Sequence, residues 1–109
     1  MGKFIKGDIV VIPFPFSDLS DSKKRPAFVL ADLTDDVILC QITSKNVRDE
    51  HGIALNNADF ISGSLPVQSN IRPNRIFTAD KNIIIKKAGN VSDVISKSVV
   101  DKIIDIITK

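Results

Sequence analysis

Short apolar runs rich in β-branched residues recur along the chain, and polar turn residues separate them. Runs of this length and composition are typical of strands rather than helices. The pattern predicts strands over six ranges: Asp8–Pro15, Ala27–Asp32, Val37–Thr43, Ile53–Leu55, Ser69–Ile76 and Ile83–Lys87. No linker, repeat or low-complexity tract interrupts them, so we expect one mainly β domain over residues 1–109.

The C-terminal segment has a helical period. Ser92 offers an N-cap oxygen at its start, and its apolar residues recur three or four positions apart. We therefore expect a C-terminal helix that packs one face on the sheet. A second, short helix is predicted near Asn74–Phe77. The residues that predict the buried face of the C-terminal helix are Val91, Val94, Ile95, Val99, Ile103, Ile106 and Ile107.

Prolines mark the first predicted strand. Pro13 and Pro15 each remove a backbone donor, so we expect this strand to run at an edge or to bend. Another proline, Pro26, directly follows Arg25 and restricts it to extended geometry. The guanidinium of Arg25 is therefore expected to stand on a rigid base at the start of a strand, a position suited to holding a phosphate.

Alternation of side chains along the third predicted strand separates a core face from a polar one. Gln41 and Thr43 fall together near the end of the strand, where a polar side chain can project into a groove. The opposite, core face is predicted to hold Ile38, Cys40 and Ile42.

Composition is that of an ordered globular protein, with 43% hydrophobic and 26% charged residues. A single cysteine, Cys40, excludes an internal disulfide and is expected to be a buried small hydrophobe. The N-terminal residues lack the apolar stretch of a signal peptide, and no run reaches the length of a membrane helix. We expect a cytoplasmic protein with no membrane partner.

A formal net charge of +2 is too small to steer the whole molecule onto a polyanion. Nucleic-acid binding would therefore rest on local clusters of cations. Four such clusters occur: Lys23-Lys24-Arg25, Lys45 with Arg48, Arg72 with Arg75, and Lys86-Lys87. Acidic residues fall largely elsewhere, so we expect surface patches of opposite sign.

Four segments resemble the MazF/PemK-like toxins of bacterial toxin–antitoxin pairs, in the same order and at compatible spacing. The segments are Gly7 to Leu19, Lys23-Lys24-Arg25-Pro26-Ala27-Phe28-Val29-Leu30, Ile42-Thr43-Ser44-Lys45 and Ser69 to Thr78. The resemblance spans essentially the whole chain. It implies a small SH3-like barrel that forms a homodimer, acts as a metal-independent endoribonuclease on single-stranded RNA and is neutralised by a separate antitoxin protein.

Cleavage of RNA through its 2′-hydroxyl requires a bound phosphodiester, an activated hydroxyl, stabilisation of the phosphorane and a proton for the departing oxygen. One histidine, one cysteine and no clustered carboxylate motif leave no credible metal site, so no cofactor is expected. The resemblance implies that Arg25 neutralises the phosphorane and that Thr43 hydrogen-bonds the phosphate or ribose. His51 is an alternative proton shuttle, although its setting is that of a loop histidine.

Polar residues flanking this pair are expected to line a groove for unpaired bases. The candidates are Ser17, Lys23, Lys24, Gln41, Ser44, Lys45, Arg72 and Asn74. Two other functions stay open: a CcdB-like toxin that binds DNA gyrase, and an SH3-like domain that binds RNA without cutting it. Arg25 together with Thr43 favours the nuclease, since a gyrase binder has no chemical need for that pair.

Overall fold

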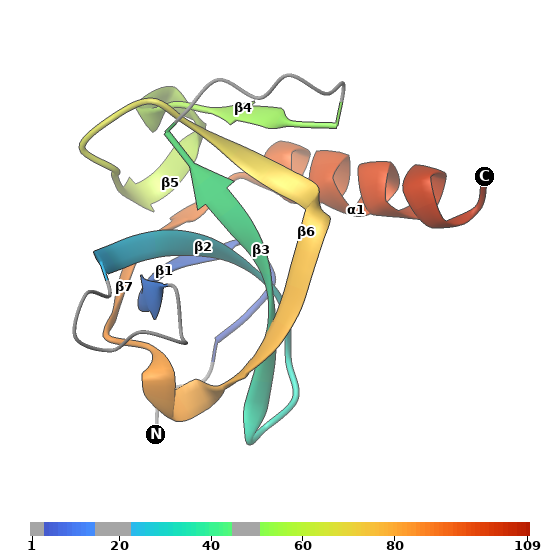
Figure 1. Ribbon diagram of the computed structural model, residues 1–109. Coiled ribbons are helices and arrows are strands. Elements are labelled where there is room, and N and C mark those ends of the chain that lie inside the picture. The colour runs from blue at the N-terminus through green and yellow to red at the C-terminus, as the bar shows by residue number, and fades with distance from the viewer. Residues whose placement is uncertain (1–3, 15–22, 45–50) are drawn as a thin grey trace.

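The computed structural model describes residues 4–14, 23–44 and 51–109. In this part of the chain, strands of one antiparallel sheet lie in the order β4-β6-β3-β2-β1-β7-β5, with α1 beside it (Figure 1). The strands are β1 Asp8–Phe14, β2 Lys23–Asp32, β3 Asp36–Thr43, β4 Ile53–Leu55, β5 Phe60–Gly63, β6 Ser69–Asp80 and β7 Lys86–Val91. Two 3-10 turns, η1 Asn57–Asp59 and η2 Lys81–Ile83, and the helix α1 Asp93–Ile107 complete the elements.

The sheet curls into a half-barrel because four of its described strand pairs contain register shifts, which bend and twist the strands (Figure 1). The predicted small barrel, mainly β with a C-terminal helix, is therefore confirmed. Curling gives the sheet two buried faces. The helix-side cluster includes Ile9, Phe28, Cys40, Ile42, Ile71, Ile95 and Val99. The barrel cluster comprises Val10, Ile12, Ala27, Val29, Val37 and Leu39.

Strand β3 contributes to both clusters, so the single core face predicted for it is incomplete. Cys40 and Ile42 are fully buried under α1, as expected, but Val37 and Leu39 on the other face are fully buried as well. Ile38, expected in the core, is only half-buried. The polar Gln41 and Thr43 lie on the barrel face, beyond the point where its apolar residues end.

Strand β6 differs most from the sequence prediction. No helix forms near Asn74–Phe77, because these residues belong to a strand that continues to Asp80. The pairing with β3 jumps from Gln41–Arg72 to Cys40–Ile76, so residues 73–75 bulge out of the ladder. Pro73, which lacks a backbone donor, stands at the start of this bulge, where a strand tolerates proline.

Three other element predictions need correction. Strand β2 begins at Lys23, four residues before Ala27, because its first residues pair with β1. The run predicted as strand Ile83–Lys87 starts in η2, and its strand is Lys86–Val91; Ile83 and Ile84 pack on the barrel cluster without pairing. Strand β5 was missed: it depends on Gly63, whose φ of +77° favours glycine and whose Cβ would collide with the Ala88 carbonyl.

The C-terminal helix is confirmed, and the Ser92 hydroxyl accepts a hydrogen bond from the Ile95 amide at 3.4 Å. Ile95 and Val99 are buried in the helix-side cluster. Val94 and Ile107 are 73% and 71% exposed, so their assignment to the buried face was wrong. Among the described residues, no helix is both long enough and apolar enough to cross a membrane.

The expectation for Pro13 is met locally. Strand β1 pairs with β2 from Ile9 to Phe14, but its pairing with β7 ends at Val11–Lys86. The carbonyl of Val11 accepts from Ile85 on the β7 side, and backbone groups two residues apart point the same way. The missing donor of Pro13 therefore falls where no strand is paired with β1.

Candidate functional site

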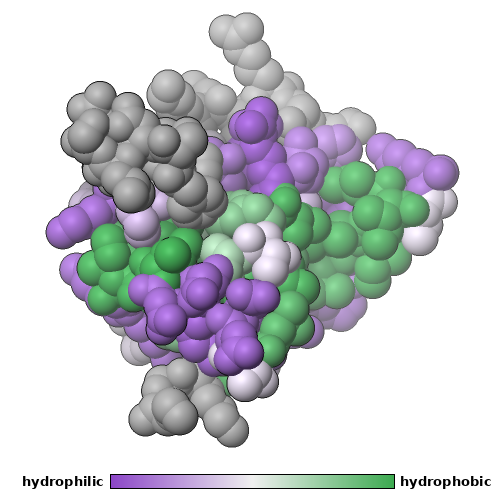
Figure 2. Space-filling view, turned by 60° about the horizontal axis from the view of Figure 1, so that its bottom comes forward, coloured by the Kyte–Doolittle hydropathy of each residue, from purple (hydrophilic) through white to green (hydrophobic). Residues whose placement is uncertain are grey.

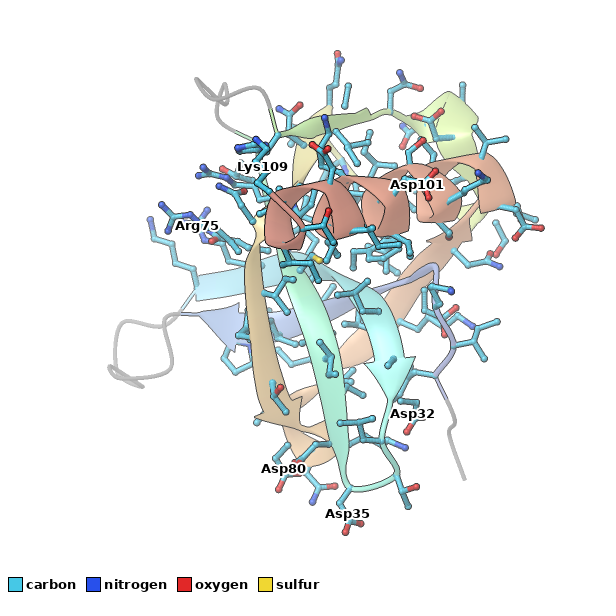
Figure 3. All side chains as sticks on the ribbon, turned by 90° about the vertical axis from the view of Figure 1, so that its right-hand side faces the viewer. Asp32, Asp35, Arg75, Asp80, Asp101 and Lys109 are labelled. Atoms are coloured by element: carbon cyan, nitrogen blue, oxygen red, sulfur yellow. The ribbon has the colours of Figure 1, made fainter. Side chains whose placement is uncertain are left out.

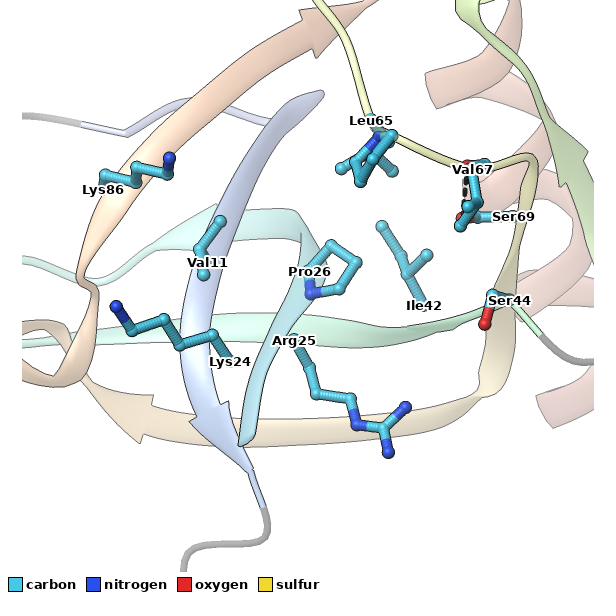
Figure 4. A pocket seen from close by; sticks show the side chains of 11 residues that line it. Val11, Lys24, Arg25, Pro26, Ile42, Ser44, Leu65, Val67, Ser69 and Lys86 are labelled. Carbon is cyan, nitrogen blue, oxygen red and sulfur yellow. Dashed lines mark hydrogen bonds between the residues drawn. The ribbon is translucent and has the colours of Figure 1, made fainter. Parts of the chain in front are cut away.

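Arg25 is the third residue of β2 and lies opposite Ile12 of β1. The side chain is half-buried. Figure 4 shows its guanidinium pointing away from Pro26 and Ile42, which face the other side of the sheet. The stem of Arg25 is thus fixed by the strand, while its charged end projects from the barrel face.

Thr43 shares that face with Arg25. The last paired residues of β2 and β3 are Ala27 and Gln41, which lie directly opposite each other. Arg25 and Thr43 are each two residues farther toward the same end of the sheet, and side chains two residues apart point to the same face of a strand. Both are half-buried, neither exposed in full nor enclosed in the core.

Strand β6 adds two more polar side chains to this face. Asn70 lies opposite Thr43, and Arg72 lies opposite Gln41. Each of these residues is half-buried. We call the five residues the polar row: Arg25, Gln41, Thr43, Asn70 and Arg72.

Asn70 was missed from the sequence. The signal that would have found it is the alternation in Ser69-Asn70-Ile71-Arg72, which puts Asn70 on the face of Arg72 once Ile71 is assigned to the core. The polar row continues the barrel face beyond the apolar barrel cluster. It therefore places two cations and three neutral hydrogen-bonding groups at one end of that face.

The remaining predicted site residues are not all brought together. Lys23 lies two residues before Arg25, on the same face, whereas Lys24 and Ser44 line a cavity of the opposite face. Asn74 is exposed in the bulge of β6. Ser17 and Lys45 lie outside the described residues.

That cavity has a volume of about 370 Å³ and is mainly apolar (Figure 4). Lys86, which the sequence analysis did not include among the site residues, stands with Lys24 beside Val11 at one edge. Arg25 contributes to the boundary between the cavity and the polar row. The residues around the cavity are Val11, Lys24, Arg25, Pro26, Ile42, Ser44, Leu65, Pro66, Val67, Ser69 and Lys86.

Charges of opposite sign are separated only in part, since Lys81 pairs with Asp32 and Lys97 pairs with Asp101. Figure 3 shows Asp32, Asp35 and Asp80 gathered at one end of the molecule and Arg75 near Lys109 toward the other. The ion pair with Lys81 and the amides of Phe4 and Thr34 lower the pKa of Asp32 to about 2. Asp32, Asp35 and Asp80 thus lie away from Arg75, so these three carboxylates do not offset its charge.

Other reactive groups are differently placed. Burial raises the pKa of the Cys40 thiol to about 12, so it is not a thiolate nucleophile at neutral pH. His51 is half-buried just before β4. Within residues 4–14, 23–44 and 51–109, no three histidine, cysteine or carboxylate side chains gather as a metal-ligand set.

Solved structures share this fold over nearly the full chain. MazF from Deinococcus radiodurans superposes with a TM-score of 0.76 at 16% identity, covering 100% of both chains. An endoribonuclease in complex with its cognate antitoxin, from a mycobacterial species, gives 0.75 at 13% identity and covers 99% of this chain and 96% of its own. A chain of a MazE–MazF crystal structure from Deinococcus radiodurans gives 0.76 at 16% identity, with 94% of each chain covered.

No curated protein sequence matches the chain. The family model for "PemK-like, MazF-like toxin of type II toxin-antitoxin system" matches residues 5–107. This match covers every described strand and helix, including the strand ends that carry the polar row. The chain therefore belongs to the PemK-like, MazF-like toxin family of type II toxin–antitoxin systems.

Proposed function

We propose that this toxin is a metal-independent, sequence-specific endoribonuclease that cuts single-stranded RNA by attack of a ribose 2′-hydroxyl on the adjacent phosphate. The observation that carries the proposal is the shared face of Arg25 and Thr43, both half-buried at the cationic end of β2 and β3. The products are a 2′,3′-cyclic phosphate and a 5′-hydroxyl.

Arg25 is proposed to bind the scissile phosphate and to neutralise the charge that develops on the phosphorane. A guanidinium is suited to this role because its planar donors match two phosphate oxygens. Its pKa lies above about 12, so Arg25 acts as a fixed cation and donor rather than as a proton carrier. Thr43 is proposed to hydrogen-bond the same phosphate or its ribose, which fixes the 2′-oxygen for attack.

Neighbouring polar residues are proposed to hold the RNA on either side of the cut. Arg72 and Gln41 extend the polar row along β6 and β3. Unpaired bases are the parts of RNA that proteins read, and the 2′-hydroxyl distinguishes RNA from DNA. The other proposed contacts are Ser17, Lys23, Lys24, Ser44, Lys45 and Asn74.

A cognate antitoxin is the proposed protein partner. One solved structure of the same fold is an endoribonuclease in complex with its antitoxin, and another is a MazE–MazF structure. An acidic antitoxin segment would complement the cationic strand ends and compete with RNA there. Both the toxin and this partner are proposed to act in the cytoplasm.

A homodimer is proposed to form through the C-terminal half of α1. Ile104 and Ile107 are 50% and 71% exposed on neighbouring positions of the helix, and Ile76 of β6 is 43% exposed. Figure 2 shows an apolar surface on the side where α1 lies in Figure 1. A second copy would remove these side chains from water on both subunits at once, as a two-fold interface does.

The decisive experiment incubates the purified protein with single-stranded RNA in excess EDTA. Discrete fragments with cyclic-phosphate ends are expected, and single-stranded DNA of the same sequence is expected to stay intact. RNA that is bound but uncut would overturn the nuclease in favour of an RNA-binding module. Inhibition of DNA gyrase without RNA binding would point to a CcdB-like toxin.

A further inference from the structure

The apolar cavity faces the opposite side of the sheet from the polar row, yet the two are separated by one residue along each strand. Pro26 follows Arg25 on β2, and Ile42 precedes Thr43 on β3. Consecutive strand residues point to opposite faces. The ends of β2 and β3 therefore form a lip with the polar row on one side and the cavity on the other (Figure 4).

The chemistry of the cavity suits a flat ring that carries polar edges. Its walls are apolar, from Val11, Pro26, Ile42, Leu65 and Val67. Its volume of about 370 Å³ lies near the lower end of the roughly 300–1,000 Å³ found for small-ligand pockets. The space therefore fits a single ring system better than a folded peptide segment.

A buried hydroxyl gives the cavity a polar contact. Ser69 is 2% exposed, and its Oγ donates to the Val67 carbonyl at 3.0 Å. The donated proton leaves lone pairs on this oxygen that can accept from a ring N–H or amino group. An aliphatic side chain of a bound peptide has no N–H group to donate to Ser69, so this contact favours a ring with polar edges as the ligand.

The rim of the cavity is cationic. Lys24 and Lys86 are exposed and flank Val11, which lies opposite both Pro26 and Lys86 (Figure 4). Two ammonium groups beside an apolar cavity complement a nucleotide, whose base is apolar on its faces and whose phosphate is anionic. The chain has no tryptophan or tyrosine, and Phe28 is fully buried in the core, so burial in an apolar cavity offers a base an alternative to stacking on an aromatic side chain.

We propose that this cavity receives one unpaired base of the RNA, from a nucleotide next to the phosphate bound at Arg25, and thereby contributes to the choice of cleavage sequence. The inference rests on the proposed nuclease function. A strand of RNA that crosses the lip presents neighbouring nucleotides to its two sides. Lys24 and Lys86 then bind the phosphate of the buried nucleotide, and Ser69 accepts from the edge of its base.

The test fills the cavity from its exposed edge. Val67 is 56% exposed and lines the cavity, so Val67→Trp is expected to occupy it without disturbing the core. Ile61→Trp is the matched control, because Ile61 is 67% exposed on β5 and does not line the cavity. Thermal unfolding of both variants checks that they fold.

Binding is measured by fluorescence anisotropy with 2′-O-methyl RNA oligonucleotides, which cannot be cut, each carrying one abasic replacement. In the unsubstituted protein, one abasic position is expected to weaken binding about tenfold, the order of effect of losing one base contact. In Val67→Trp, the intact oligonucleotide is expected to bind about as weakly, and the same abasic replacement to cause no further loss. Ile61→Trp should keep the original dependence on position.

An unchanged dependence on the abasic position in Val67→Trp would overturn the cavity assignment, and so would the absence of any sensitive position. Cleavage of unmodified RNA of the same sequence is followed in parallel. Suppose that the unsubstituted protein cuts the RNA and that Val67→Trp shows the same dependence of binding on the abasic position as the unsubstituted protein. This result would support the nuclease and reject the base pocket. Protein that binds none of the oligonucleotides and leaves the unmodified RNA uncut would overturn both.

Discussion

Ala27 of β2 and Gln41 of β3 lie directly opposite each other and are the last pair of these two strands toward the polar row. The next side chains on that face are Arg25 and Thr43, which stand at the open end of the barrel face rather than in its apolar cluster. A cation and a hydroxyl held this way by two paired strands can contact one phosphate with little reorganisation.

If Arg25 and Thr43 act on the same phosphate, their removal should not be additive. Arg25→Ala is expected to lower kcat for RNA cleavage by about 10²–10³, the usual effect of losing one preorganised donor. Thr43→Val is expected to lower it less, because a neutral hydroxyl donates a weaker bond than a cation. The double variant should lose less than the product of the two single effects.

Cleavage is measured under single-turnover conditions in EDTA, so that product release does not limit the rate. Arg25→Lys keeps the charge but loses the planar pair of donors, and an intermediate rate is expected. Lys97→Ala is the control, since Lys97 is exposed on α1 and pairs with Asp101. Full activity of Arg25→Ala in a folded protein would contradict the proposed mechanism.

Ile104→Lys is expected to convert a homodimer into a monomer, because it puts a charge into the apolar surface at the end of α1. Sedimentation equilibrium at micromolar concentration measures the mass. Val94→Lys serves as the control: Val94 is 73% exposed in the first turn of the same helix. A monomeric unsubstituted protein, or a dimer that tolerates Ile104→Lys, would refute this interface.

The Asp32 carboxylate joins three segments, since it accepts from the amides of Phe4 and Thr34 and pairs with Lys81 at 2.7 Å. Its folded pKa of about 2 lies below the ordinary value of 3.8, so the ionised form is stabilised by folding. This contribution is complete at neutral pH and is lost as pH falls from about 4 toward 2.

Asp32→Asn should therefore destabilise the protein at pH 7 and make progressively less difference at lower pH. Urea unfolding midpoints of both proteins, measured from pH 7 to pH 2, test this. Asp35→Asn alters an exposed carboxylate of the same turn and provides the comparison. A difference in midpoint that stays constant over this range would mean that the charge of Asp32 is not what stabilises the fold.

The Cys40 thiol should resist modification in the folded protein. It is fully buried between β3 and α1, and its pKa is raised to about 12 by that burial. Ellman's reagent at pH 8 is expected to release no thionitrobenzoate from the native protein and one equivalent after denaturation. Rapid reaction of the native protein would contradict the burial of Cys40. Loss of RNA cleavage in a folded Cys40→Ala variant would contradict the proposed mechanism, in which the thiol takes no part.

The sequence alone determined the local elements whose signals lie within a few residues. The period of Ile95 and Val99 with the Ser92 cap predicts α1, and alternation along β3 puts Gln41 and Thr43 on one face. Such patterns follow from the geometry of one strand or one helix, so no partner is needed to recognise them. The pairing of Arg25 with Thr43 as candidates came from the family resemblance.

Only the tertiary structure decided which strands meet and which faces are covered. The bulge of β6 at Pro73 depends on pairing with β3. The local sequence near Asn74 does not contain this pairing, and a short helix was therefore predicted there. Val37 and Leu39 are buried because the sheet curls over them, and Asn70 joins the polar row because β6 lies beside β3. Register between distant strands is set by the packing of the whole sheet, and the sequence of a single strand does not identify the strand that pairs with it.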